Sequence, residues 1–324
     1  MSHDGSILAV GAFEEDGRAS GINQPYSDES DQSGAVYVYA HKENSWYEEA
    51  YLKSSNNYRG GNFGASLDVS QDGRTIAVGA PFAESVYVFR KSENSQDLIN
   101  TSGWYEEKRF SSRSIFSSYY TYPFEPTTSF GYSVSLSNNG NKMAVGAPMA
   151  NYYAFYKITD EGKSDDLNNK GALDNDHFSE GAVVLYNYVD GKWDDGKEVR
   201  APNANRLDNF GMSVSLNAKG TRLAVGAPFE SNRLDGFYST YTNKYNGLAK
   251  KSGAVYVYDV SESFISNNGY LKSLVQNNID LFGFAIDTDR NGVLAVLSPH
   301  EKASSQDDSS SNETFSGEGA VYVY

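Results

Sequence analysis

The 324-residue sequence contains no cysteine, only four histidines, and no apolar run long enough to cross a membrane. The absence of cysteine excludes disulfide bonds, thiolate catalysis and thiolate metal sites, although both cytosolic and secreted proteins can lack it. The N-terminal segment has no basic region followed by a sustained apolar stretch, so we expect no export signal within this sequence.

Basic residues are also in the minority, with 27 Lys and Arg against 42 Asp and Glu and a formal net charge of −15. A field of this sign repels the phosphates of nucleic acids and of anionic membranes, and it favours cations or basic protein surfaces. We therefore expect no nucleic-acid partner and no direct membrane insertion.

Signatures of catalysis are missing as well. The four histidines, His3, His41, His177 and His300, are scattered, and no pair has the spacing of metal ligands or of a base and its nucleophile. No G-x-S-x-G elbow, phosphate-binding loop or HExxH motif is present. The expectation is that the chain has no catalytic residues and is not an enzyme.

The chain does have a strong internal repeat, and its first two phrases are the clearest. The first phrase opens a short alternating strand, strand A, at Phe63-Gly64, Phe130-Gly131, Phe210-Gly211 and Phe282-Gly283. The second phrase, strand B, reads Ala-Val-Gly-Ala-Pro in its best copies and ends at Phe13, Pro81, Pro148, Pro228 and Pro299. The copy that ends at Pro299 is degraded to LAVLSP.

Two further phrases follow in the same order. Strand C, typified by GAVYVY, begins at Gly34, Glu84, Gly181, Gly253 and Gly319. A weaker strand D begins at Trp46, Trp104, Trp193 and Tyr270. Alternation of β-branched and aromatic residues with a period of two is the signal of a strand.

Four short antiparallel strands per repeat predict an all-β fold, a β-propeller of four-stranded blades. Five repeats are visible, at about 1–58, 59–125, 126–205, 206–278 and 279–324, within a single domain. The first lacks strand A and the last lacks strand D, so these two cannot merge into one blade. We expect a propeller, or a propeller fragment that is part of a longer chain.

The Phe-Gly and Val-Gly-Ala-Pro phrases together resemble the FG-GAP repeats of integrin alpha chains and of bacterial surface proteins, over nearly the whole sequence. The resemblance implies a propeller, usually of seven blades, with calcium in the A–B hairpins of some blades and ligands bound on the opposite face. It also implies a role in adhesion or recognition at the cell surface or outside the cell.

The calcium pattern of that family is only partly present. The best matches are Asp287, Asp289 and Asn291, followed by Asp68 and Asp72, and both loops lack the closing acid. In the other hairpins only a glycine persists, which is also what a tight turn requires. Possible calcium binding and plain hairpin turns therefore both remain open.

The long B–C and D–A loops are expected to emerge on one face of the propeller, and three of them are rich in tyrosine. The candidate ligand-binding residues are Tyr119, Tyr120, Tyr122, Tyr152, Tyr153, Tyr156, Tyr238, Tyr241 and Tyr245. Tyrosine among Ser, Asn and Gly is typical of recognition loops, because a rigid ring buries area and still forms hydrogen bonds. The alternative is that these rings pack together as a lid.

These features predict an extracellular adhesion or recognition module that binds a protein or a glycan through its long, tyrosine-rich and acidic loops. Two alternatives stay open. One is a carbohydrate-active enzyme or lectin on the same scaffold, which would need carboxylates converging beside the aromatic loops. The other is a structural spacer within a larger surface protein.

Overall fold

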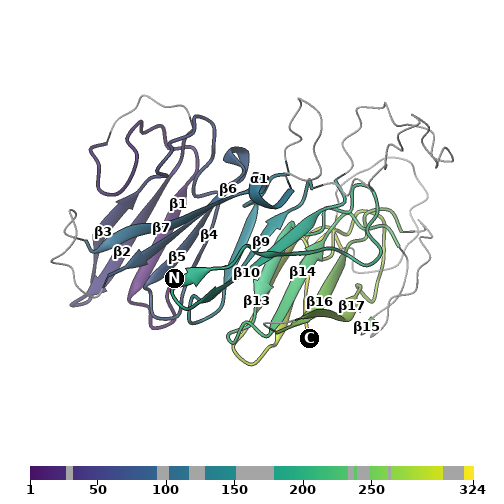
Figure 1. The fold of residues 1–324 in the computed structure, drawn as a ribbon. Coiled ribbons are helices and arrows are strands. Elements are labelled where there is room, and N and C mark those ends of the chain that lie inside the picture. The colour runs from purple at the N-terminus through teal and green to yellow at the C-terminus, as the bar shows by residue number, and fades with distance from the viewer. Residues whose placement is uncertain are drawn as a thin grey trace, which may run out of the picture.

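The computed structural model describes residues 1–26, 32–92, 102–116, 128–150, 179–232, 249–261, 264–301 and 317–324, and the backbone of 237–238. Five small antiparallel sheets follow one another in chain order, from the purple first sheet to the fifth near the C-terminus (Figure 1). They form an all-β propeller of five blades with three to five strands each, which confirms the predicted fold class.

Each blade collects strands that are close in the sequence. The first contains β1 (Ile7–Ala12), β2 (Ala35–Lys42) and β3 (Ser45–Leu52); the second contains β4 (Ser66–Val69), β5 (Thr75–Ala80), β6 (Ser85–Lys91) and β7 (Trp104–Ser111). The third contains β8 (Ser133–Leu136), β9 (Lys142–Ala147), β10 (Ala182–Val189), β11 (Lys192–Trp193) and β12 (Lys197–Val199). The fourth contains β13 (Ser213–Leu216), β14 (Arg222–Ala227), β15 (Phe237–Tyr238), β16 (Ala254–Val260) and β17 (Ile265–Leu271), and the fifth contains β18 (Ala285–Thr288), β19 (Leu294–Ser298) and β20 (Ala320–Val323).

Helical structure is slight. A 3₁₀ turn, η1 (Pro81–Ala83), follows β5, and a short helix, α1 (Ser112–Phe116), follows β7. Among the described residues, no helix is long and apolar enough to cross a membrane.

The middle strands of the inner blades are apolar on both faces because each blade packs between two neighbours. Every residue of β5 is buried, for example. The described apolar residues form four clusters, one at each junction between successive blades. Val10 of the first blade is 43% exposed, whereas the equivalent Val78, in a blade packed between two described neighbours, is fully buried.

The two repeated phrases meet at the junctions between blades. A Cβ added to Gly146 of β9 would lie 2.0 Å from the carbonyl oxygen of Gly211 in the next blade, so only glycine fits there. The hydroxyl of Ser133 donates a hydrogen bond of 2.9 Å to the same carbonyl. The pairs Gly11 and Gly64, Gly79 and Gly131, and Gly226 and Gly283 make the same close approach.

On the side that faces away from the fourth blade, the fifth blade lacks both the glycine and the serine that make this contact. Leu297 stands where the other blades have the close-packed glycine of strand B. Ala285 stands where strand A of blades two to four has the serine that donates to the next blade. The degraded LAVLSP phrase therefore removes the surface on which a further blade of the same kind would pack.

Candidate functional site

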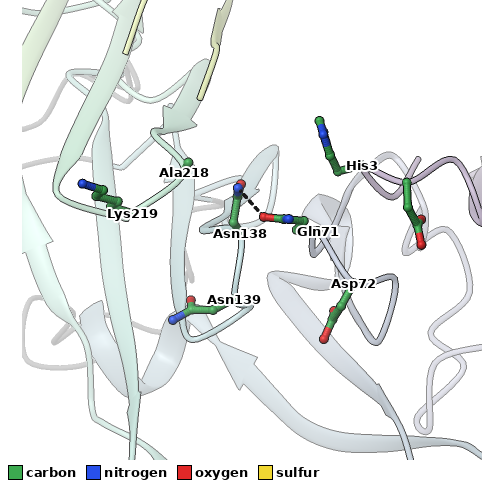
Figure 2. Close-up of a pocket in the computed structure, with 8 residues that line it drawn as sticks. His3, Gln71, Asp72, Asn138, Asn139, Ala218 and Lys219 are labelled. Atoms are coloured by element: carbon green, nitrogen blue, oxygen red, sulfur yellow. Dashed lines mark hydrogen bonds between the residues drawn. The ribbon is translucent and has the colours of Figure 1, made fainter. Parts of the chain in front are cut away.

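Backbone hydrogen bonds at one end of the propeller join the A–B turns of blades two to four to one another and to the segment before β1. His3 N–H donates to the Gln71 carbonyl (3.2 Å), Gln71 N–H to the Asn138 carbonyl (2.8 Å), and Asn138 N–H to the Ala218 carbonyl (2.9 Å). The Asn138 side-chain amide also donates to Gln71 Oε1 at 2.7 Å (Figure 2). Together with Asp4, Asp72, Asn139 and Lys219 these residues line a polar depression, which we call the turn face.

The predicted ligand Asp72 lies on the turn face and stabilises its own hairpin. Its Oδ1 accepts hydrogen bonds from the Ser70 hydroxyl (2.6 Å) and from the Arg74 N–H (3.0 Å). Asn139 makes the same pair of contacts in the third blade, with the Ser137 hydroxyl and the Asn141 N–H. A short polar side chain that accepts from the backbone two residues later is characteristic of turns.

The predicted ligand Asp68 lies between two blades. Its Oδ2 accepts the N–H of Leu136 in the third blade at 2.7 Å, and its Oδ1 accepts the N–H of Val69 at 2.8 Å. Burial raises the pKa of this carboxyl to about 6, and the two N–H donors oppose that rise. The side chain therefore links β4 of the second blade to β8 of the third.

The remaining predicted metal residues occupy the A–B turn of the fifth blade. Asp289 Oδ1 accepts the N–H groups of Asn291 (2.8 Å) and Val293 (2.7 Å), and Asp287 Oδ1 accepts the N–H of Thr288 (2.8 Å). Among the described residues, no three His, Asp or Glu side chains come together as metal ligands. Both carboxylates accept N–H groups of their own turn, and calcium binding here stays a prediction.

At the opposite end of the blades, a buried lysine holds the base of the first long B–C loop. Lys53, at the end of β3, donates to Glu15 Oε2 (2.6 Å) at the start of this loop and to the Ser33 hydroxyl (2.7 Å) at its end. The lysine side chain is fully buried, whereas that of Glu15 is 17% exposed. One ammonium group therefore closes a loop whose ends are far apart in the sequence; we call this arrangement a clasp.

The fourth blade repeats the clasp in a drier environment. Lys272 donates to Glu230 Oε2 (2.6 Å) and to the Ser252 hydroxyl (2.8 Å), and the side chains of both Lys272 and Glu230 are fully buried. Burial lowers the pKa of Lys272, and Glu230 opposes that shift. Burial, with Glu230 as the next cause, raises the pKa of the neighbouring Asp208 to about 8.

Blades three and two have related contacts at the same end of the blade. In blade three, Arg200 stands at the lysine position, 3.9 Å from Glu180, and donates to the Gly181 carbonyl at 3.2 Å. In blade two, Glu84 accepts the Thr128 hydroxyl and the Ser129 N–H, and burial raises its pKa. Each of these blades therefore has a glutamate at the base of its loops, held by a different donor.

Sequence reasoning missed the clasps, although a signal was present. The phrase Tyr-Leu-Lys-Ser occurs at both Tyr51–Ser54 and Tyr270–Ser273, and a lysine that recurs directly after the apolar end of a strand points to a buried partner. The partner could not be identified, because Glu230 and Lys272 are 42 residues apart.

Most of the predicted ligand-binding tyrosines lie outside the described residues: Tyr119, Tyr120, Tyr122, Tyr152, Tyr153, Tyr156, Tyr241 and Tyr245. Tyr238 lies in β15, whose backbone pairs with β17 opposite Tyr270. Of the loops that carry these tyrosines, the one in the fourth blade begins near Glu230 and ends near Ser252, the two residues bound by Lys272. We call this end of the propeller the loop face.

No protein-family model matches the chain, and no curated protein matches it. Solved structures do resemble it. A protein of Bacteroides uniformis provisionally named a 6-phosphogluconolactonase is 12% identical, with a TM-score of 0.43, over 83% of this chain. A protein of Bacteroides fragilis with the same provisional name is also 12% identical, with a TM-score of 0.43, over 86% of this chain.

The β-propeller domain of Cps50 (Swd1) from Myceliophteria thermophila is 7% identical, with a TM-score of 0.40, over 82% of this chain. The chain spans between 58% and 62% of the length of these three structures. Likeness at this level assigns no activity, and the fold itself rests on the five sheets described above.

The prediction that the chain is not an enzyme is corrected by these comparisons. Two propellers similar to it carry the provisional name of an enzyme, 6-phosphogluconolactonase. The absence of familiar catalytic motifs was too weak a ground for the exclusion, because unrelated active sites can be built on one fold from loop residues that share no short motif. The findings establish a five-bladed β-propeller and no narrower family.

Proposed function

We propose that the chain is a recognition or adhesion propeller of the FG-GAP kind that acts outside the cell or at its surface and binds a protein or a glycan at the loop face. The observation that carries this proposal is the pair of clasps. Lys53 and Lys272 each fix both ends of a long loop to a rigid blade through buried, charge-assisted hydrogen bonds.

Clasped loops suit recognition for a physical reason. A binding loop must project from a scaffold, yet every degree of freedom it loses on binding lowers the affinity. Fixing the loop base beforehand removes part of that cost, as binding sites on rigid supports require. A loop that served only as a connection would gain little from a fully buried ion pair, which costs desolvation energy to form.

The loop sequences supply contact chemistry for such a site. The segments 117–127, 151–178 and 239–248 contain eight of the nine predicted tyrosines, and the last two segments also contain Ser, Asn and Gly. Tyrosine offers a flat apolar ring for stacking on sugars or protein side chains and a hydroxyl for hydrogen bonding. The net charge of −15 favours a basic protein surface or a cation at the site, and calcium at Asp287, Asp289 and Asn291 remains part of the proposal.

The test is a binding screen of the labelled protein against arrays of glycans and cell-surface proteins, followed by variants. Tyr153→Ala and Tyr238→Ala are expected to reduce binding of any ligand found by about tenfold or more, as for aromatic residues at the centre of an interface. The control is Tyr47→Ala, because Tyr47 is 52% exposed on β3, near the opposite end of the blade. Unchanged binding in both loop variants would reject the proposed site.

A further inference from the structure

We propose that the outer edge of β7, the last strand of the second blade, is a self-association surface at which two copies of the chain pair their β7 strands antiparallel around a two-fold axis. The partner is therefore a second copy of this chain. In the strand order β4-β5-β6-β7 this edge faces away from the strands that contact neighbouring blades near the centre. It lies apart from the loop face, and the proposal does not depend on the proposed ligand site.

The first observation is an uncovered strand edge within the chain. In the first blade the B–C loop returns to the outer edge of β3, where the Lys53 N–H donates to the Gly21 carbonyl at 2.8 Å. In the fourth blade β15 pairs with β17 in the same place. The second blade has only η1 and Glu84 between β5 and β6, which is too short a connection to reach β7. Within the described residues, β7 pairs with β6 alone.

The second observation is that the charges along β7 are complementary to themselves. Its sequence is WYEEKRFS, in which Glu106 and Glu107 are followed by Lys108 and Arg109. Around a two-fold axis between residues 107 and 108, Glu106 of each copy lies opposite Arg109 of the other, and Glu107 lies opposite Lys108. Opposite charges directly across a strand pair stabilise it. The equivalent strands β3 and β17 contain no basic residue.

The backbone of β7 is in phase with this pairing because the strand contains a β-bulge. In a regular strand, two residues three positions apart, such as Glu106 and Arg109, direct their N–H groups to opposite edges. The register of β7 against β6 shifts between Val88 and Phe89, so Glu107 is an extra residue in β7. The extra residue brings the N–H groups of Glu106 and Arg109 to the same edge.

The hydrogen bonds at the two ends of β7 show that this is the outer edge. The Ser112 N–H donates to the Glu84 carbonyl at 3.0 Å, and the Ser92 N–H donates to the Gly103 carbonyl at 2.8 Å. Bonded and non-bonded pairs alternate from both ends toward the bulge. The residues of β7 whose N–H and carbonyl groups point away from β6 are then Trp104, Glu106, Arg109 and Ser111. Pairing around the two-fold axis matches the first of these with the last and the second with the third.

The side chains at this edge retain capacity for a partner. Arg109 is exposed, and its Nε donates to the Ser85 hydroxyl at 3.3 Å, which leaves the terminal nitrogens of the guanidinium for a carboxylate. Glu106 accepts the N–H (3.1 Å) and the hydroxyl (2.8 Å) of Ser55, and each of its oxygens can accept a further hydrogen bond.

Charged side chains and a bulge also occur on edges that avoid partners. Such protection works by placing like charges together when two edges meet. Antiparallel pairing of β7 with itself places unlike charges together instead, so the same residues favour association. In the resulting dimer the sheet of one second blade continues into that of the other, and the two loop faces point in opposite directions.

The experiment measures self-association of the complete protein by sedimentation velocity across the micromolar range. The unchanged protein is expected to form a dimer. Arg109→Glu places a carboxylate opposite Glu106 of the other copy, and Glu106→Arg places two guanidinium groups opposite each other. Each substitution acts twice in the symmetric interface, and each is expected to weaken dimerisation by about tenfold or more.

The decisive comparison mixes the two variants in equal amounts. Opposite charges then face each other at both places, and a dimer with one copy of each variant is expected to form nearly as tightly as the unchanged dimer. The double variant Glu106→Arg with Arg109→Glu should also dimerise again. The matched control is Glu48→Arg, at the position of β3 equivalent to Glu106, which is expected to leave association unchanged.

Thermal unfolding checks that the variants are folded, and Arg109→Glu, at an exposed side chain, decides the proposal if Glu106→Arg does not fold. A monomer throughout the micromolar range would overturn the proposal. So would a dimer that Arg109→Glu does not weaken, or a mixture of folded variants that associates no more strongly than either variant alone.

Discussion

The clasp of the fourth blade permits a quantitative test, because it can be opened by one substitution. Lys272→Met keeps most of the length of the side chain and removes its charge. The variant loses the hydrogen bonds to Glu230 Oε2 and the Ser252 hydroxyl and leaves a fully buried Glu230 without its cation. Breaking a buried ion pair by removing one partner costs about 3–5 kcal/mol, and we expect a loss of unfolding free energy in that range.

The first blade provides the matched control. Lys53→Met breaks the same contacts, but Glu15 is 17% exposed and can be rehydrated. We therefore expect a smaller loss, about 1–3 kcal/mol. In the fourth blade, the double variant Lys272→Met with Glu230→Leu is expected to recover most of the stability, because no buried charge remains unpaired.

The assay is urea denaturation at pH 7, with the unfolding free energies compared at equal slopes. A loss below about 1 kcal/mol in Lys272→Met, or no recovery in the double variant, would refute the view that the clasp is a dry ion pair. If Lys53→Met lost as much unfolding free energy as Lys272→Met, exposure of the glutamate would not determine how strongly removal of the lysine destabilises the protein.

Three further predictions follow from the same structure. Gly146→Ala is expected to destabilise the protein by about 3 kcal/mol or more in the same assay, because its Cβ would lie 2.0 Å from the Gly211 carbonyl oxygen. Ser133→Ala loses only one hydrogen bond to that carbonyl and should cost about 1 kcal/mol. Equal losses would contradict the close contact between Gly146 and Gly211. The pKa of Asp208 rises from the ordinary 3.8 to about 8. Between these pH values the folded protein binds one more proton at Asp208 than the unfolded protein does. The unfolding free energy should therefore fall by about 1.4 kcal/mol per pH unit as the pH rises from 4 to 8. Asp208→Asn should remove that part of the slope, and an unchanged slope would count against the raised pKa. Calcium binding at the fifth-blade turn, measured by calorimetry, should be lost in Asp289→Ala and kept in Asp72→Ala; the absence of any calcium binding would remove that part of the proposal.

The strands were predictable because their signals are local. Alternating Val and aromatic residues predict strands such as β2 and β16, and the repeated order of phrases predicts their assembly into blades. The three described strands of the last blade, β18, β19 and β20, also follow from the order of phrases. These inferences need no knowledge of which residues touch across the molecule.

The contacts between blades were not predictable in the same way. The Phe-Gly and Val-Gly-Ala phrases were recognisable as repeats, but only the structure shows that Gly146 and Gly211 meet. Asp68 matched a calcium ligand by its spacing, yet it accepts a backbone N–H from the next blade. Spacing along one chain cannot distinguish a metal ligand from an acceptor for a neighbouring strand, because both need an oxygen atom at the end of a strand.

The most direct test of a recognition site at the loop face is hydrogen–deuterium exchange of the protein with and without a ligand found in the binding screen. The account predicts protection of the B–C segments 13–33, 149–180 and 229–252 and little change in the A–B turns. Protection confined to the turn face, at 71–73, 138–140 and 218–220, would contradict it.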